Sequence, residues 1–212
     1  MTENITVFKQ NHILITSGGK KIHVDPFQYD EAPHDADFIL ITHDHFDHFS
    51  VEDIGRAGCK NTVLIVPMSM RDKAAGAGKF VGKIAEVKPG RSYDVYGLQF
   101  ETVPAYNVGK PFHPRRAEWV GYILKLDGKR IYIAGDTDAT EEAKAVKCDI
   151  ALVPVGGTYT MDAKQAAELV NTIKPQIAVP VHYGGVVGKA GDGLDFKKAV
   201  CKDTEVVIKI KS

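Results

Sequence analysis

The stretch FILITHDHFDHFS, residues 38–50, joins an apolar run to a dense polar cluster. The chain has eight histidines in 212 residues, and three of them fall between positions 43 and 48 together with two aspartates. A continuous apolar run of this kind is typical of a strand buried on both faces. Crowding polar groups at the end of such a strand is costly unless a charge of opposite sign compensates them. The stretch therefore predicts a buried strand that ends in a cation site.

Size and composition narrow the class of protein. At 212 residues with 44% hydrophobic residues, we expect a single domain over residues 1–212 with a sizeable core. Lys plus Arg and Asp plus Glu both total 27, and this zero net charge argues against a nucleic-acid partner bound by bulk positive charge. We see no signal peptide and no apolar run near the roughly 20 residues of a membrane helix. Three scattered cysteines indicate reduced thiols and a cytoplasmic protein: Cys59, Cys148 and Cys201.

The order of apolar runs divides the chain into two comparable halves. Strands are expected at 5–8, 12–16, 21–25, 38–42 and 62–67, then at 84–87, 92–95, 98–103, 119–126, 130–135, 149–155, 176–182 and 204–210. Helices are expected at 51–56, 68–75, 140–147, 162–173 and 195–201. Residues 104–118 form a long loop, and loops of that length are often functional. The pattern predicts an α/β protein with sheet layers covered outside by helices.

The polar cluster has the spacing H-x-H-x-D-H: His43, His45, Asp47 and His48. Side chains two residues apart on a strand point the same way, so His43 and His45 can share one point. The following turn can bring Asp47 and His48 to a neighbouring point. Imidazoles and a carboxylate suit zinc, with bonds of about 2.0–2.2 Å, and manganese or iron fits the same residues. The alternative is a solvated loop without metal, which this spacing after a buried strand disfavours.

H-x-H-x-D-H after a buried strand resembles the signature of the metallo-β-lactamase superfamily. The resemblance implies a four-layer αβ/βα sandwich, in which two mixed sheets are covered by outer helices. It also implies further ligands at distant strand ends. Asp136 in IYIAGDTD would bridge two metal ions, and His182 in IAVPVHYG would be the final histidine. Asp25 in KIHVDPF matches an early aspartate that supports the site more plausibly than it binds metal.

Two divalent ions are implied by the same resemblance. One ion would be held by His43 and His45, and the other by Asp47, His48 and His182. Such pairs of ions make a shared water nucleophilic near neutral pH. Asp47 would also act as a catalytic group that accepts or returns a proton.

Smaller motifs narrow the resemblance. VDPF, ETVPAYN, FHP, GDTD, PVGGTYTM and PVHYG together resemble the small metal-dependent hydrolases that include the ascorbate-6-phosphate lactonases. This implies a hydrolase that cleaves a small anionic ester, lactone or phosphodiester. Two alternatives stay open: a nuclease or phosphodiesterase that acts on RNA or DNA, and a non-catalytic metal-binding protein on the same scaffold. The sequence also leaves open whether the chain forms a homo-oligomer.

The third ligand of the first ion is undecided in the sequence. The strand that should end in a histidine ends in Ala105-Tyr106-Asn107, so Asn107, a water, or the loop residue His113 could complete the site. His12 is a further candidate, or an ordinary strand histidine. We count His113 among the catalytic candidates for this reason.

Substrate-binding groups are expected in two loops. Tyr159 in GGTYTM could donate its hydroxyl to the substrate or to developing negative charge. Side chains in NVGKPFHPRR predict capture of an anionic, for example phosphorylated, substrate, with a solvated charged loop as the alternative: Lys110, His113, Arg115 and Arg116. The glycine pairs 156–157 and 184–185 are expected to serve tight turns.

Overall fold

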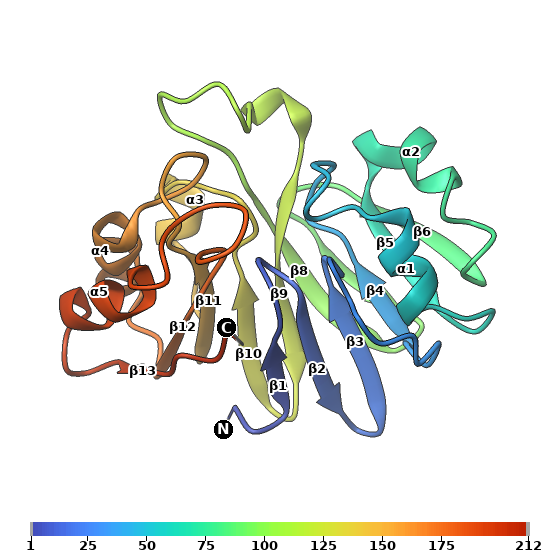
Figure 1. Cartoon of the computed structure of the whole chain (residues 1–212), viewed down its shortest axis with the longest axis horizontal. Coiled ribbons are helices and arrows are strands. Elements are labelled where there is room, and N and C mark those ends of the chain that lie inside the picture. Colours follow the sequence, from blue (N-terminus) through green and yellow to red (C-terminus); the bar gives the residue numbers. More distant parts are fainter. Residues whose placement is uncertain (1, 211–212) are drawn as a thin grey trace.

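The computed structural model describes residues 2–210 and contains two β-sheets that pack face to face (Figure 1). The first sheet has six strands in chain order: β1 (Ile5–Val7), β2 (Ile13–Ser17), β3 (Lys20–Val24), β4 (Phe38–Leu40), β5 (Val63–Pro67) and β6 (Lys83–Val87). The second has seven strands, again in chain order: β7 (Ser92–Val95), β8 (Leu98–Pro104), β9 (Val120–Leu126), β10 (Lys129–Ile133), β11 (Ile150–Pro154), β12 (Ile177–Val181) and β13 (Glu205–Val206).

Both sheets are mixed. In the first, β1 to β3 pair antiparallel and β3 to β6 pair parallel. In the second, β7 to β10 pair antiparallel and β10 to β13 pair parallel. Parallel neighbours are joined by crossover connections, and all of these except the β3–β4 connection contain a helix. The predicted mixed sheets are confirmed.

Helices complete the four layers. The first sheet is covered by α1 (Val51–Ala57), the 3₁₀ turn η1 (Met68–Met70) and α2 (Arg71–Ala75), and the second by α3 (Glu141–Lys144), α4 (Ala163–Ile173) and α5 (Asp192–Ala199). In Figure 1 the two helical groups lie on opposite sides of the paired sheets. The α/β sandwich that the sequence predicted is therefore confirmed.

Continuous apolar strands follow from this layering. In β5, Val63 and Ile65 face the core between the sheets, whereas Leu64 and Val66 pack beneath α1 and α2. Strand β11 divides in the same way between the central core and the core beneath α4. A strand in such a position is apolar at every residue because side chains alternate between two buried faces.

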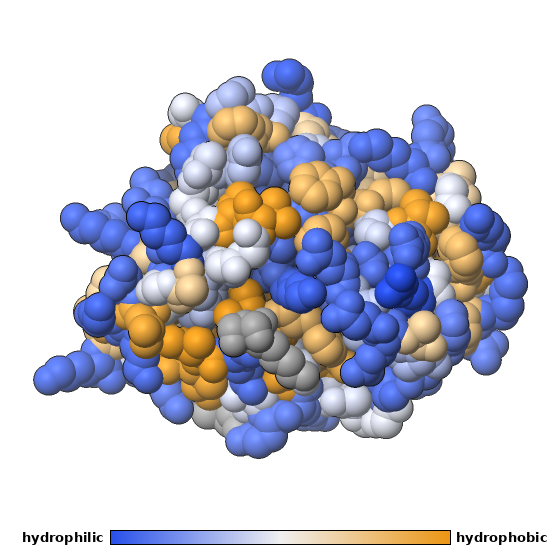
Figure 2. All heavy atoms as spheres, in the orientation of Figure 1, coloured by the Kyte–Doolittle hydropathy of each residue, from blue (hydrophilic) through white to orange (hydrophobic). Residues whose placement is uncertain are grey.

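Some boundaries differ from the prediction. Helix α5 begins at Asp192 and not near residue 195, and the final strand covers two residues of the seven expected. The long loop between β8 and β9 contains the short 3₁₀ turn η2 (Arg115–Ala117) and rises above the sheets in Figure 1. Hydrophilic side chains cover most of the face shown in Figure 2, with small apolar patches among them. Within residues 2–210, no helix has the length and apolar character needed to span a bilayer.

Two buried histidines lie together at the first sheet: His12 directly precedes β2, and His23 lies in β3. His12 Nε2 is 3.0 Å from His23 Nδ1, and His12 also stacks on Phe8 at 4.5 Å between ring centroids. Burial lowers the pKa of His23 to about 4, a shift that the charge of Asp35 partly opposes. His12 thus behaves as a core histidine packed beside a second one, which answers the question that its sequence position left open.

We predict that replacing His23 flattens the pH dependence of stability. The folded-state pKa of His23 lies below its ordinary value of 6.5, so the unfolded chain takes up a proton first and stability falls as pH drops from about 6.5 towards 4. The contribution between pH 7.5 and pH 5 is about 2 kcal/mol. In urea unfolding with chelator present, the free energy of unfolding should fall by about 2 kcal/mol less for His23→Gln than for wild type between pH 7.5 and pH 5. The exposed-site variant His34→Gln should keep the wild-type loss, and equal losses in all three proteins would contradict the prediction.

Candidate metal centre

The polar residues singled out in the sequence lie at one edge of the sandwich, where strands end. His43 comes after β4, Asp136 after β10, and His182 directly after β12. The second sheet holds the segment that leads into His43, because the Tyr122 hydroxyl of β9 donates to the Ile41 carbonyl at 2.7 Å. Side chains from both sheets therefore meet at a fixed separation.

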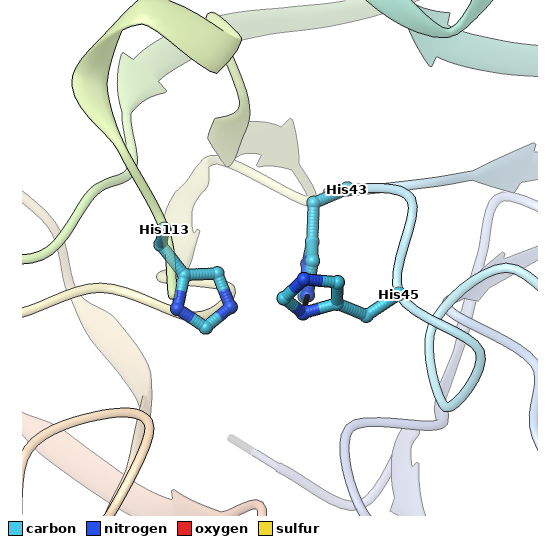
Figure 3. A group of neighbouring side chains, drawn as sticks. All are labelled: His43, His45 and His113. Atoms are coloured by element: carbon cyan, nitrogen blue, oxygen red, sulfur yellow. Dashed lines mark hydrogen bonds between the residues drawn. The ribbon is translucent and has the colours of Figure 1, made fainter. Parts of the chain in front are cut away.

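A first group of ligand atoms contains three imidazoles. His43 Nε2 lies 3.2 Å from His45 Nδ1, and His113 joins them so that one ring nitrogen of each lies within 4.8 Å of the others. Figure 3 shows His113 reaching in from the β8–β9 loop towards the two histidines that follow β4. Asp136 Oδ2 is 3.3 Å from His113 Nε2 and 3.9 Å from His43 Nε2.

A second group lies beside the first. His48 Nε2 is 3.1 Å from His182 Nε2, and Asp47 Oδ2 is 3.4 Å from His182 Nε2. Asp136 Oδ1 is 3.3 Å from both of these histidine nitrogens. One oxygen of Asp136 thus faces each group, which is the arrangement required of a bridging carboxylate.

The spacing and the unused hydrogen-bonding capacity fit divalent metal ions. A tetrahedral site with bonds of about 2.0–2.2 Å places its ligand atoms about 3.3–3.6 Å apart, close to the separations within both groups. Among the described residues, His113 Nε2 and Asp136 Oδ1 are buried without a hydrogen-bond partner. Such groups are expensive to bury unless they bind something.

The charge of the cluster points the same way. The three carboxylates are buried: Asp25, Asp47 and Asp136. Burial would lower the pKa of His48, but Asp136 and Asp25 raise it to about 9. For Asp47, burial opposes ionisation, yet the hydrogen bond from His182 and the charge of His48 lower its pKa to about 2. The neighbouring imidazoles also lower the pKa of Asp136, so Asp47 and Asp136 are held ionised, and a divalent cation bound here would compensate their negative charge.

Asp25 supports the centre from behind. Its Oδ2 accepts from His48 Nδ1 at 2.7 Å, from the Thr42 hydroxyl at 2.6 Å and from Asn11 Nδ2 at 2.7 Å. Its Oδ1 accepts from the Thr42 backbone N–H at 2.8 Å. Because Asp25 holds Nδ1 as the donor, a His48 that gives up its second proton to a metal ion would present the lone pair of Nε2 to the second group, as metal-ligating histidines do when a carboxylate holds their other nitrogen.

Asn107 orients His113 in the same way as Asp25 orients His48. Its Oδ1 lies 3.1 Å from His113 Nδ1 and accepts from the His113 backbone N–H at 3.0 Å, while its Nδ2 donates to the Tyr159 carbonyl at 2.9 Å. The structure thus places His113 with His43 and His45, whereas Asn107 contacts His113 on the side away from them and holds its ring. Sequence reasoning left these two roles open because only the folded loop brings residue 113 back to the strand end.

Glycines allow the turns around His182. A Cβ on Gly156 would lie 2.3 Å from the His182 carbonyl oxygen, so no larger residue fits there. Gly184 has a φ of +73°, which glycine adopts without strain. Both glycine pairs serve the turns, as the sequence predicted.

Two residues beside the centre had no signal in the sequence. Trp119 packs against the rings of His43, His45 and His113 with centroid separations of 5.0–5.5 Å. Gln10 donates through Nε2 to Asp47 Oδ2 at 3.1 Å. Neither residue type is a usual metal ligand, so a search for ligands passes over both.

A cavity of about 290 Å³ opens onto the centre. Its polar floor consists of His45, Asp47, Asp136 and His182, and its walls of apolar and aromatic side chains: Phe46, Phe112, Tyr159, Val186 and Val187. Tyr159 packs edge-on against Phe112 at 4.7 Å between centroids. Four of these wall residues are exposed: Phe46, Phe112, Tyr159 and Val186. Exposed apolar side chains around a polar floor are typical of a substrate pocket.

Two basic residues of the β8–β9 loop, Lys110 and Arg115, are paired with carboxylates. Lys110 Nζ lies 2.7 Å from Asp138 Oδ1, and Arg115 lies 2.6 Å from Glu142. Arg115 also lies over the ring of Tyr106. Among the described residues that line the cavity, none is a lysine or an arginine.

Fold and clustered ligands together define a protein of the metallo-β-lactamase type. A family model described as the β-lactamase superfamily domain matches residues 4–182. Relatives named UPF0173 metal-dependent hydrolase are 36% identical in Pyrococcus abyssi, over 90% of this chain and 89% of theirs, and 33% identical in Thermococcus onnurineus, with the same coverage. The chain belongs to the metallo-β-lactamase superfamily, as a metal-dependent hydrolase.

Solved structures agree with the fold. A protein from Parabacteroides distasonis, 34% identical, superposes with a TM-score of 0.81 over 97% of this chain and 91% of that one. A metallo hydrolase from Ignicoccus hospitalis, 24% identical, superposes with a TM-score of 0.78 over 96% and 93%. The narrower resemblance to ascorbate-6-phosphate lactonases stays a prediction.

Asp25→Asn is expected to weaken zinc binding about 10- to 100-fold, because His48 then loses the carboxylate that orients it. Competition with a chromophoric chelator measures this affinity. Asp53→Asn is the matched control, since Asp53 is also buried but accepts from the backbone N–H groups of Gln28 and Tyr29. An equal loss in both variants would mean that the effect is general destabilisation.

Proposed function

We propose that this chain hydrolyses a small carboxylic ester or lactone at a centre of two divalent metal ions, with zinc as the favoured metal and manganese or iron as alternatives. His43, His45 and His113 would hold one ion, Asp47, His48 and His182 the other, and Asp136 would bridge them. The observation that carries the proposal is the pair of ligand groups joined by the two oxygens of Asp136 and open to an apolar cavity.

The ions, when bound, supply a nucleophilic water near neutral pH and a Lewis acid for the oxygen that gains charge. The chain supplies position and proton transfer. Asp47 is ionised and lies on the cavity floor, so it can accept a proton and return it to the leaving group. Tyr159, on the wall, can donate its hydroxyl to negative charge that develops on the substrate.

The cavity walls support an apolar substituent on the substrate. Phe46, Phe112 and Val186 offer exposed hydrocarbon surface. Two of the cationic side chains in the β8–β9 loop, Lys110 and Arg115, are paired with carboxylates outside that loop. A carboxylic ester or lactone with an apolar side fits this lining better than the phosphorylated substrate that the loop composition predicted. A small negative charge on the substrate would be met by the metal ions alone.

The cavity also argues against the two alternatives, a nuclease and a non-catalytic metal-binding protein. A nuclease needs a basic surface that follows a phosphate backbone, whereas the walls of this cavity are apolar and include no lysine or arginine among the described residues that line it. A structural metal site is closed by protein ligands, whereas these groups border an open cavity. Hydrolysis of a small neutral or weakly anionic molecule is therefore the better supported function.

Metal removal tests the proposal directly. Zinc-loaded protein should contain about two ions per chain and hydrolyse p-nitrophenyl esters or γ-lactones, lose that activity with chelator, and regain it with zinc. Asp136→Asn should lower both zinc content and kcat/KM, the latter at least about 100-fold. Asp127→Asn, in the β9–β10 turn, is the control and should match wild type.

Two results would contradict the proposal. Zinc binding without turnover across esters, lactones and bis(p-nitrophenyl) phosphate would favour a non-catalytic metal protein. Turnover confined to the phosphodiester would favour a phosphodiesterase.

Phe112→Ala is expected to raise KM for an aryl or long-chain ester about tenfold, with kcat little changed, because it removes apolar contact that is equal in ground and transition states. Arg116→Ala is the matched loop control and should leave KM unchanged. A KM that rises in the arginine variant alone would instead support capture of an anionic group.

A further inference from the structure

The tip of the β1–β2 hairpin lies against the metal centre. The tip is closed by backbone hydrogen bonds from Phe8 N–H to the His12 carbonyl at 2.9 Å and from His12 N–H to the Lys9 carbonyl at 3.0 Å. Gln10, at its apex, is 1% exposed and has a φ of +54°. A non-glycine residue in this backbone region is strained and marks a position that the surrounding structure holds in place.

Gln10 contacts three separate parts of the site. Its Nε2 donates to Asp47 Oδ2 at 3.1 Å, and its Oε1 accepts from the Val186 backbone N–H at 3.2 Å. Its backbone carbonyl accepts from the His182 N–H at 2.8 Å. A side-chain amide has a donor and an acceptor on one rigid plane, so it can join a carboxylate to a backbone N–H. Leucine has neither group, and glutamate lacks the donor.

These contacts hold three parts of the site in place: the Asp47 carboxylate, the loop that contains Val186, and the backbone at His182. Asp47 Oδ2, which receives the Gln10 donor, is the oxygen that lies 3.4 Å from His182 Nε2. Val186, which donates to Gln10, lies with Val187 on the cavity wall. His182 itself has a φ of +59°, and the hydrogen bond from its N–H is one of the constraints that maintain that conformation.

We infer that Gln10 is a positioning residue that fixes the Asp47 carboxylate for its metal ion and at the same time holds loop 184–188 as the wall of the substrate cavity. The first half rests on the proposed metal centre, whereas the second half concerns the protein alone. One side chain thereby couples metal affinity to the shape of the pocket.

Gln10→Leu, which keeps bulk and removes both side-chain bonds, tests the inference by two readouts. Hydrogen exchange at the Val186 amide, in the metal-free protein, should become at least about tenfold faster, with exchange in the sheet cores unchanged. Zinc affinity, measured by chelator competition, should fall about 10- to 100-fold. Gln99→Leu is the matched control, because it removes a surface Gln99–Asp94 hydrogen bond of 3.2 Å, and it should change neither readout.

Gln10→Asn keeps the amide but is one methylene shorter, and it replaces the leucine variant if that variant does not fold. It should also speed exchange at Val186 and weaken zinc affinity, each by a smaller factor. Unchanged exchange at Val186 overturns the loop half of the inference, and unchanged zinc affinity overturns the coupling. If wild-type protein binds no zinc, the proposed function fails, whereas the exchange result still decides whether Gln10 holds the loop.

Discussion

The burial of charge at one edge of the sandwich is the constraint on which the rest of the structure depends. Three carboxylates and five imidazoles lie there with little exposure, apart from the half-buried His45. Each buried ion costs several kcal/mol unless it is paired and hydrogen-bonded. Hydrogen bonds and neighbouring imidazoles offset part of this cost: Asp25 accepts four hydrogen bonds, and Asp136 lies between two groups of imidazoles. The two divalent cations of the proposed centre would complete the compensation.

The layered core makes this concentration of charge possible. The central core and the two outer cores fix strands β4, β10 and β12, so the residues after them keep their separations without help from solvent. The centre then needs few adjustable parts, namely the β8–β9 loop that delivers His113 and the β1–β2 hairpin tip that reaches Asp47. The hydrogen bond from Tyr122 to the Ile41 carbonyl ties the two sheets where these parts meet.

Much of this could be predicted from the sequence, because strands buried on both faces are continuous apolar runs and metal ligands belong to few residue types. The cluster at 43–48 stands out on those grounds, whereas Asp136 and His182 are predicted through the resemblance to the metallo-β-lactamase superfamily. The place of His113 could not be read, since it depends on Asn107 and a loop conformation set by distant contacts. Gln10 escaped notice because an amide serves many roles and its own neighbours in sequence give no hint of Asp47. The ion pairs of the basic loop could not be read for a related reason: the carboxylates that pair with Lys110 and Arg115 lie 28 and 27 residues away along the chain.

The contrast between the polar floor and the apolar wall has a chemical consequence. Hydrocarbon walls exclude water, and electrostatic interactions on the floor are stronger where the local dielectric is low. A substrate whose apolar part fills the cavity therefore strengthens the field that acts on its own carbonyl. A strongly solvated phosphate would lose its hydration on entry and meet no cationic side chain in the walls to replace it. Under the proposed function, the same lining would give apolar substrates their contact surface and would disfavour strongly charged ones, so selectivity and rate would follow from one feature of the pocket.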